Sequence, residues 1–403
     1  MITKNKILPT LMFSFLLSQG AFSATTDSSY ILVTPDCLIN KFDAPYQTLS
    51  HNKNFSLIKL NVENFTKLIG VRNSQKTLCG GFINVTDAYN SSHFSNENSA
   101  LFLEKYIPKT SISKKQFNYG INHTKEVNQL LALLNPDEMW KNLTKLSSYT
   151  DRYANSDTGL GAARWIKSQV EQIAKDNGRT DVTTSIINTG TSYKQPSVVV
   201  KIGNSTKPAV VVGAHMDTLS SFWGNMPGAD DDGTGSVTVL ELARVLLSSS
   251  MHFQKPIYLI WYSAEEEGLV GSQYVVAEFK KDNIPVEEVI HFDMTGYTPN
   301  NDKTMWLLSD NTDKELTSYL ELLINTYIKK PLKYTKCGYA CSDHATWTNN
   351  GYKAAIAFEA EDGKYNPYIH TSQDTMSQLS LEHMTDFTKL AIAFTGELAD
   401  PVS

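Results

Sequence analysis

Residues 208–217 read PAVVVGAHMD, and this short run decides the fold class of the chain. Its apolar part is continuous rather than alternating, which is typical of a strand covered on both faces, as in a mostly parallel sheet. A second run of the same kind, IYLIWY, occupies residues 257–262. Ionisable side chains follow both runs within a few residues, so the same segments that predict the sheet also point to its chemistry.

Around these two runs, helical and strand patterns alternate from Pro136 to the C-terminus, which predicts an α/β fold. One helix is marked by apolar residues at helical spacing, with Ser156 and Asp157 as possible N-caps and Gly178 as the stop. Further strands are expected at 197–202, 208–213, 256–262, 286–292, 304–308 and 354–358, and helices at 236–248, 313–328 and 381–398. We therefore expect a three-layer sandwich, in which helices cover both faces of a mostly parallel, doubly wound sheet.

Three of the expected strands run directly into ionisable residues. His215 and Asp217 follow the first strand, Glu265 and Glu266 follow the second, and Asp293 follows the strand at 286–292. In open α/β sheets the carboxyl ends of the strands gather at one crevice. These side chains are therefore expected to converge there.

Two loops add further candidates, the acidic triplet Asp230–Asp232 and His370. Taken singly, a histidine at a strand end is more often structural, and an acidic triplet is more often a solvated turn. Two histidines together with several carboxylates are the mixture that zinc prefers. The combination therefore predicts a metal site.

Composition limits the possible classes of protein. The chain has 403 residues, of which 41% are hydrophobic and 19% charged, so disorder, a collagen-like fibre and a coiled coil are excluded. Its formal net charge is −6, which offers no basic stripe for phosphates and argues against a nucleic-acid partner.

The N-terminus has the pattern of a secretory signal peptide at residues 1–23. Lys4 and Lys6 precede an apolar core at 7–17, and small residues flank the expected cleavage position. A membrane anchor would need about 20 apolar residues, and this core is shorter and contains Pro9. No later stretch is long and apolar enough to span a membrane, so we expect a secreted protein in an oxidising environment.

Residues 24–126 differ in character from the rest of the chain. They are rich in Asn, Ser and Thr, contain short strand-like runs, and hold Cys37 and Cys79, whose simplest fate is a bridge to each other. A polar, lysine-bearing connector lies at 107–126 and resembles a linker open to proteases. The domain boundary is expected there.

Five segments resemble the signature segments of a known family, the co-catalytic dizinc aminopeptidases of peptidase family M28, and in particular its secreted bacterial leucyl aminopeptidases. The segments are GAHMD at 213–217, PGADDD at 227–232, AEEEG at 264–268, DMT at 293–295 and IHT at 369–371. They occur in the order of the family, and the resemblance covers the chain from about Pro136 onward.

The resemblance implies two zinc ions per catalytic domain and a role for each site residue. Asp231 would bridge the metals, with His215 and Asp293 completing one zinc and Glu266 and His370 the other. Glu265 would be the general base, Asp217 would hydrogen-bond the far nitrogen of His215, and Tyr339 would help to stabilise the oxyanion. The apolar pocket for the first side chain would be lined by Met294, Leu308, Phe358, Tyr365 and Ile369.

Other residues near these motifs receive plainer interpretations. Cys337 and Cys341 are expected to form a short-loop disulfide rather than to bind zinc. Asp230 and Asp232 would orient their loop, and Glu267 would be solvated. None of these residues is expected to take part in the chemistry.

The implied reaction is removal of the N-terminal residue of a peptide with a free amine, by a metal-bridged hydroxide whose proton Glu265 takes. The expected first residue is Leu or another hydrophobic residue, although Glu361 and Asp362 at the pocket rim could instead admit Lys or Arg. A carboxypeptidase or glutaminyl cyclase-like metallohydrolase is the alternative, and a non-catalytic relative is a weaker one.

Secreted relatives carry a propeptide that assists folding and blocks the active site, and residues 24–126 are placed and sized like one. The chain would then be a zymogen, a monomer that meets a processing protease and peptide substrates, with no membrane or nucleic-acid partner. An accessory binding domain that is retained in the mature protein is the alternative for residues 24–126.

Overall fold

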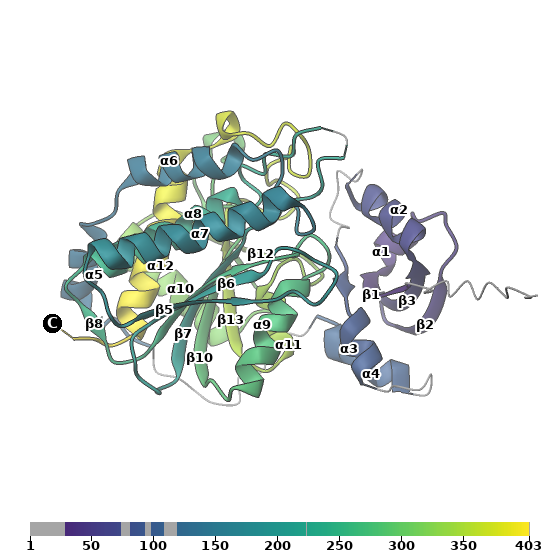
Figure 1. The fold of residues 1–403 in the computed structure, drawn as a ribbon, viewed down its shortest axis with the longest axis horizontal. Coiled ribbons are helices and arrows are strands. Elements are labelled where there is room, and N and C mark those ends of the chain that lie inside the picture. Colours follow the sequence, from purple (N-terminus) through teal and green to yellow (C-terminus); the bar gives the residue numbers. More distant parts are fainter. Residues whose placement is uncertain (1–28, 74–80, 93–97, 109–118, 223, 403) are drawn as a thin grey trace, which may run out of the picture.

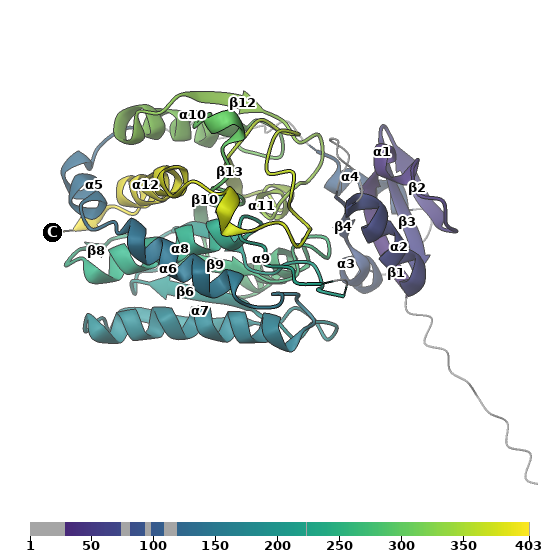
Figure 2. The same ribbon diagram turned by 90° about the horizontal axis from the view of Figure 1, so that it is seen from above.

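The computed structural model describes residues 29–73, 81–92, 98–108, 119–222 and 224–402. The expected signal peptide at 1–23 lies outside the described residues, as does Cys79. Two bodies lie side by side in both views, a smaller N-terminal unit of residues 29–108 and a larger C-terminal domain (Figures 1 and 2). Among the described residues, no helix is long and apolar enough to cross a membrane.

The N-terminal unit is a small α+β fold with a hydrophobic core of its own. Its four-stranded sheet has the order β2-β3-β1-β4, and β1 pairs antiparallel with both β3 and β4. Leu32, Leu38, Ile58, Phe65 and Leu68 form its core. The strands are β1 (Ser29–Pro35), β2 (Gln47–Asn52), β3 (Phe55–Asn61) and β4 (Ile83–Asn84), and the helices are α1 (Asp36–Ile39), α2 (Val62–Asn73), α3 (Thr86–Ser91) and α4 (Ser99–Tyr106).

The C-terminal domain is built on an eight-stranded sheet of order β12-β11-β13-β10-β7-β9-β6-β5. The central strands β9, β7, β10 and β13 are parallel to one another, whereas β5, β6 and β11 pair antiparallel with their inner neighbours. The strands are β5 (Val182–Ile187), β6 (Ser197–Ile202), β7 (Ala209–His215), β9 (Ile257–Tyr262), β10 (Val286–Phe292), β11 (Met305–Leu308), β12 (Leu332–Thr335) and β13 (Lys353–Phe358).

Helices cover both faces of this sheet, which explains why its central strands are apolar throughout. Val210 and Val212 of β7 belong to the larger core cluster, and Ala209 and Val211 belong to the cluster on the opposite face. Residues of α5 (Thr124–Leu131), α6 (Pro136–Ser147), α7 (Asp157–Asp176), α8 (Gly233–Ser248), α10 (Lys314–Leu323) and α12 (Leu381–Leu398) share the first cluster. Residues of α9 (Val270–Lys281) and α11 (His344–Asn349) share the second. The mostly parallel sheet expected from the sequence is present, with antiparallel pairings towards its two edges.

Shorter elements complete the domain. A two-stranded sheet pairs β8 (His252–Phe253) with β14 (Pro401–Val402). Two 3-10 turns are η2 (Pro299–Asn301) and η4 (Met376–Gln378), and a π-helical turn, η3 (Ile324–Ile328), extends α10.

The expected boundary at residue 126 falls inside α5, which packs with the C-terminal domain. Val127 and Leu130 are buried in its main core, and Tyr119 stacks on Tyr319 with ring centroids 4.7 Å apart. The helix expected to start at Ser156 or Asp157 is α7, and of the two possible caps Ser156 is the N-cap, because its side chain accepts a hydrogen bond from the amide of Gly159.

Candidate active site

Parallel pairing brings the ionisable residues to one edge of the sheet. In register, His215 of β7 lies opposite Tyr262 of β9, and Gly213 lies opposite His291 of β10. Glu265 and Glu266 therefore leave β9, and Asp293 leaves β10, beside His215. The crevice expected from the sequence is formed by the carboxyl ends of these three strands.

Asp231 lies between the two histidines. Its Oδ1 is 3.1 Å from Nε2 of His215, and its Oδ2 is 3.0 Å from Nε2 of His370. Asp293 Oδ1 lies 3.6 Å from Nε2 of His215, and Glu266 Oε2 lies 3.2 Å from Nε2 of His370. One carboxylate thus directs an oxygen into each of two adjoining histidine–carboxylate groups.

Asp232 also comes within reach of His215 and Asp293, so geometry alone groups these three side chains as a possible metal site. Both Asp232 oxygens, however, already accept backbone amides: those of His215 at 3.2 Å, Met294 at 3.1 Å and Gly235 at 2.8 Å. Asp232 therefore orients the loop and the start of α8, and Asp231 is the better metal ligand. The second group consists of Asp231, Glu266 and His370, and no other described residue is an alternative ligand in it.

The donor groups and charges of the site are those of a cation-binding site. Among the described residues, buried Nε2 of His215 and buried Oδ1 of Asp293 have no hydrogen-bond partner. Burial would lower the pKa of His215, but Asp293 and Glu265 raise it well above its usual value. At His370 burial again lowers the pKa, but the negative charge of Glu266 outweighs it and raises the pKa to about 9. These residues fit metal ions, which would offset the crowded negative charge.

Asp217 contacts residues of both histidine–carboxylate groups. Its Oδ1 lies 3.5 Å from Nδ1 of His215, and its two oxygens accept the amides of Glu265 at 3.0 Å and Glu266 at 3.2 Å. This position agrees with the orienting role that the resemblance implies. The neighbouring Glu265 has a pKa raised well above the usual carboxyl value, mainly by burial.

Three buried residues that the sequence did not suggest hold the metal-site loops in place. Asp374 accepts the amides of Asp230 at 3.0 Å and Asp231 at 3.1 Å, and Glu359 accepts those of residues 296 and 297 at 3.0 and 2.6 Å. Arg152 donates to the carbonyls of residues 216, 227 and 228 at 2.8, 2.6 and 2.7 Å. No spacing rule could have found them, because they lie 62 to 144 residues from these partners.

A cavity of about 670 Å³ opens over these groups. It is lined by Glu265, Tyr339 and the residues expected to form the apolar pocket, namely Met294, Leu308, Phe358, Tyr365 and Ile369. Asp231, Glu266, Asp293 and His370 line the same cavity. The candidate pocket and the candidate metal groups are therefore continuous.

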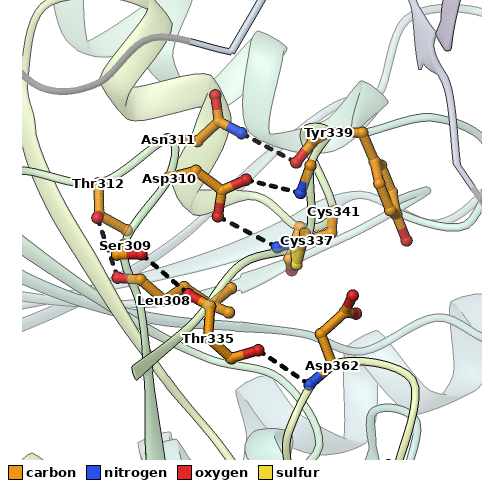
Figure 3. The surroundings of a disulfide bond; sticks show 12 residues. Leu308, Ser309, Asp310, Asn311, Thr312, Thr335, Cys337, Tyr339, Cys341 and Asp362 are labelled. Atoms are coloured by element: carbon orange, nitrogen blue, oxygen red, sulfur yellow. Dashed lines mark hydrogen bonds between the residues drawn. A yellow bond between two sulfur atoms is a disulfide. The ribbon is translucent and has the colours of Figure 1, made fainter. Parts of the chain in front are cut away.

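The Cys337–Cys341 disulfide forms one wall of the cavity, and Figure 3 shows its surroundings. Asp310 accepts the amides of Cys337 at 3.1 Å and Gly338 at 2.7 Å, and Asn311 donates to the Tyr339 carbonyl at 2.9 Å. In Figure 3 the Tyr339 ring extends from this loop on the side away from Asn311. The bridge and these hydrogen bonds hold the loop that presents Tyr339.

Glu267 was expected to be solvated, and this prediction is wrong. The side chain is only 4% exposed, and burial raises its pKa to about 7, with an opposing effect from Arg72. Arg72 belongs to the N-terminal unit. Four residues of that unit, Arg72, Asn73, Gly81 and Phe82, line the active-site cavity.

The fold and this site define a class of protein: an α/β protein with a mostly parallel sheet, whose strand ends present two adjoining histidine–carboxylate groups suited to metal ions. The family model described as Peptidase family M28 matches residues 197–395 of the chain. Leucine aminopeptidase 1 of Emericella nidulans is 39% identical over 285 residues, which cover 68% of this chain and 73% of that protein.

Solved structures agree with these sequence matches. The crystal structure of the LapA aminopeptidase of Legionella pneumophila is similar with a TM-score of 0.85 and 44% identity, covering 93% of this chain and 99% of that one. LapB from the same organism gives 0.84 and 40%, covering 92% and 100%. The chain belongs to peptidase family M28 and is an aminopeptidase, a hydrolase that acts on peptides.

Proposed function

We propose that the chain is a secreted, zinc-dependent aminopeptidase that removes one N-terminal residue at a time, with Leu or another hydrophobic residue preferred. The position of Asp231 carries this proposal, because its two oxygens face two histidines at 3.1 and 3.0 Å beside Asp293, a buried carboxylate whose Oδ1 makes no hydrogen bond in the described structure. The apolar wall of the adjoining cavity supports the hydrophobic preference.

The donor set suits two zinc ions. His215 and Asp293 would hold one, Glu266 and His370 the other, and Asp231 would be shared between them. When bound, such ions polarise a carbonyl group and lower the pKa of a water molecule to about 7.

The chain's own residues account for the proton transfers. Glu265, next to a metal ligand and held by the bond from its amide to Asp217, would take a proton from the attacking water and pass it to the departing amine. Burial raises its pKa well above the usual carboxyl value, the direction expected of a carboxylate that must accept a proton. Tyr339, on the bridged loop, would donate a hydrogen bond to the oxyanion.

Substrate orientation follows from the proposed ions. Asp231, Glu266 and Asp293 line the cavity, and zinc held by them would favour a free, unprotonated N-terminal amine, because only that form has a lone pair to donate to a metal. A carboxypeptidase of this family would not need that amine. Efficient cleavage of an N-acetylated peptide would therefore contradict the proposal that the substrate binds through its free N-terminal amine.

We also propose that residues 1–23 are a signal peptide and that 24–126 are a propeptide, removed by a processing protease to give a monomeric enzyme. The Cys337–Cys341 bridge supports an oxidising destination. The Cys37–Cys79 pairing stays a prediction. Mass spectrometry of the secreted, active protein tests the processing, because a fully active form that begins near Ala24 would exclude it.

Asp362 favours a second substrate class, peptides that begin with Lys or Arg. It lines the cavity, and burial raises the pKa of its carboxyl to about 7. Among the described residues no cation pairs with it, whereas its neighbour Glu361 pairs with Lys364 at 2.7 Å. A long cationic side chain could supply the missing partner.

The decisive experiment for the mechanism is Glu265→Ala. We expect turnover on leucine p-nitroanilide to be abolished while two zinc ions per chain stay bound, as measured by elemental analysis. Full activity of this variant would refute the assigned proton transfers, and a wild-type protein that binds no zinc would refute the metal assignment.

A further inference from the structure

The N-terminal unit reaches a candidate metal ligand directly. Arg72, in the last turn of α2, donates from Nη2 to Glu266 Oε2 at 2.9 Å and from Nη1 to the Glu266 carbonyl at 3.0 Å. The two side chains are 8% and 3% exposed. A buried, two-point contact of this kind is much stronger than a surface ion pair.

The oxygen that Arg72 contacts is the one aimed into the metal group. Glu266 Oε2 lies 3.2 Å from His370 Nε2, and His370 Nε2 lies 3.0 Å from Asp231 Oδ2. An ion held by these three side chains would use the same carboxylate oxygen as the guanidinium. It would also place a second positive charge next to Arg72, at a site largely closed to screening by solvent.

The guanidinium is held in this position by the N-terminal unit itself. Nε of Arg72 donates to Asn73 Oδ1 at 3.2 Å, and the Phe82 ring lies 5.6 Å from its central carbon. Every nitrogen of the group therefore has a fixed acceptor. Arg72 cannot swing away from Glu266 without giving up these contacts.

The unit contacts the C-terminal domain closely at two glycines, one facing a backbone amide and the other an aromatic ring. The amide of Asn84 donates to the carbonyl of Gly268 at 3.0 Å, and a Cβ at Gly268 would lie 2.6 Å from that amide nitrogen. A Cβ at Gly81 would lie 2.3 Å from the Tyr339 ring. Such close approach fixes the distance between α2 and the metal group.

We propose that Arg72 is a placeholder cation for the metal ion of the Asp231–Glu266–His370 group, so that the attached N-terminal unit and this ion compete for Glu266. The proposal rests on the zinc site proposed above. Before metal is bound, Arg72 offsets the charge of Glu266. Because coupling between two binding events is reciprocal, the ion loosens the N-terminal unit to the same degree that the unit weakens the ion.

The test compares zinc binding by full-length wild type, Arg72→Gln and Lys67→Gln, using a fluorescent chelator as competitor. Lys67 is the matched control, since it removes one positive charge from the same helix and pairs only with the exposed Glu63 in the described structure. We expect Arg72→Gln to bind the zinc ion of the Asp231–Glu266–His370 group about 5- to 150-fold more tightly than wild type, and Lys67→Gln to match wild type. Equal affinity in all three proteins would overturn the proposal.

A second measurement uses the unaltered protein and does not depend on the folding of a variant. Hydrogen exchange of α2 in full-length wild type should speed up when zinc is added, because the ion displaces Arg72. Unchanged or slower exchange would overturn the proposal. Absence of zinc binding in every protein would instead contradict the zinc site itself, so the two failures are distinguishable.

Discussion

Asp374 offers a sharp test of how the metal-site loop is held. The change is Asp374→Asn, which keeps the size of the side chain but replaces one carboxylate oxygen by an NH2 group. The carboxylate accepts the amides of Asp230 at 3.0 Å and Asp231 at 3.1 Å, and the amide of Asn366 donates to it at 3.3 Å. The NH2 group cannot accept from a backbone amide, so at least one of these bonds is lost.

The size of the effect follows from those bonds. A hydrogen bond to a charged group contributes about 1.5–3 kcal/mol, and each 1.4 kcal/mol is about tenfold in an equilibrium constant. If the loop must recover its position for Asp231 to bind metal, zinc affinity should fall about 10- to 100-fold, the range usual for residues that support metal ligands. Chelator competition measures this affinity, and kcat/KM at saturating zinc should recover most of its value.

Asp310→Asn is the matched control. Asp310 also accepts two backbone amides, those of Cys337 at 3.1 Å and Gly338 at 2.7 Å, but it holds the disulfide loop rather than the Asp231 loop. We expect a lower melting temperature without a change in zinc affinity. Zinc affinity of Asp374→Asn within twofold of wild type, or an equal loss in both variants, would refute the reasoning.

Three further predictions concern the loop, the pocket and the core. Replacing Cys337 and Cys341 together by Ser should lower the free energy of unfolding by about 2 kcal/mol, from loop closure alone, and should reduce kcat because the loop presents Tyr339; denaturation and steady-state assays measure the two effects. If Asp362 selects cationic residues, Asp362→Asn should lower the ratio of kcat/KM on lysine to leucine p-nitroanilide about tenfold or more, whereas Glu361→Gln should leave it unchanged. Burial raises the pKa of Glu288 from 4.5 to about 8, so the folded state holds its proton more tightly and wild type should lose stability as pH rises through that window. Glu288→Gln should remove this loss, and urea denaturation at about pH 5 and about pH 9 would contradict the prediction if both proteins responded alike.

The centre of the sheet could be predicted because its physics is local. The apolar runs at 208–213 and 257–262 became β7 and β9, since strands buried on both faces need no polar side chains. The edge strands β5 and β12 were not predicted, because their burial alternates irregularly and their residues are partly exposed. Edge position is a property of the whole sheet, so no short window of sequence contains it.

The site residues also divide into those that local sequence predicts and those that it does not. His215, Asp231, Glu265 and Glu266 stand at strand ends or in a compact motif, which made their convergence predictable. Arg152 is fully buried against three carbonyls, yet as a sequence feature it is an ordinary arginine. Glu267 likewise follows two candidate site residues but turns into the interior. Such roles depend on neighbours from distant parts of the chain and become visible only in three dimensions.

The separate core of the N-terminal unit has a consequence for how long its contact with the active site could last. After a cut in the connector, the N-terminal unit would stay folded and could still bind the C-terminal domain, because it has a core of its own. While the units are joined, each experiences the other at an effective concentration on the order of millimolar. After a cut, the contact becomes bimolecular and depends on dilution, so a complex of about micromolar affinity would persist at high protein concentration and dissociate when the protein is diluted well below that concentration.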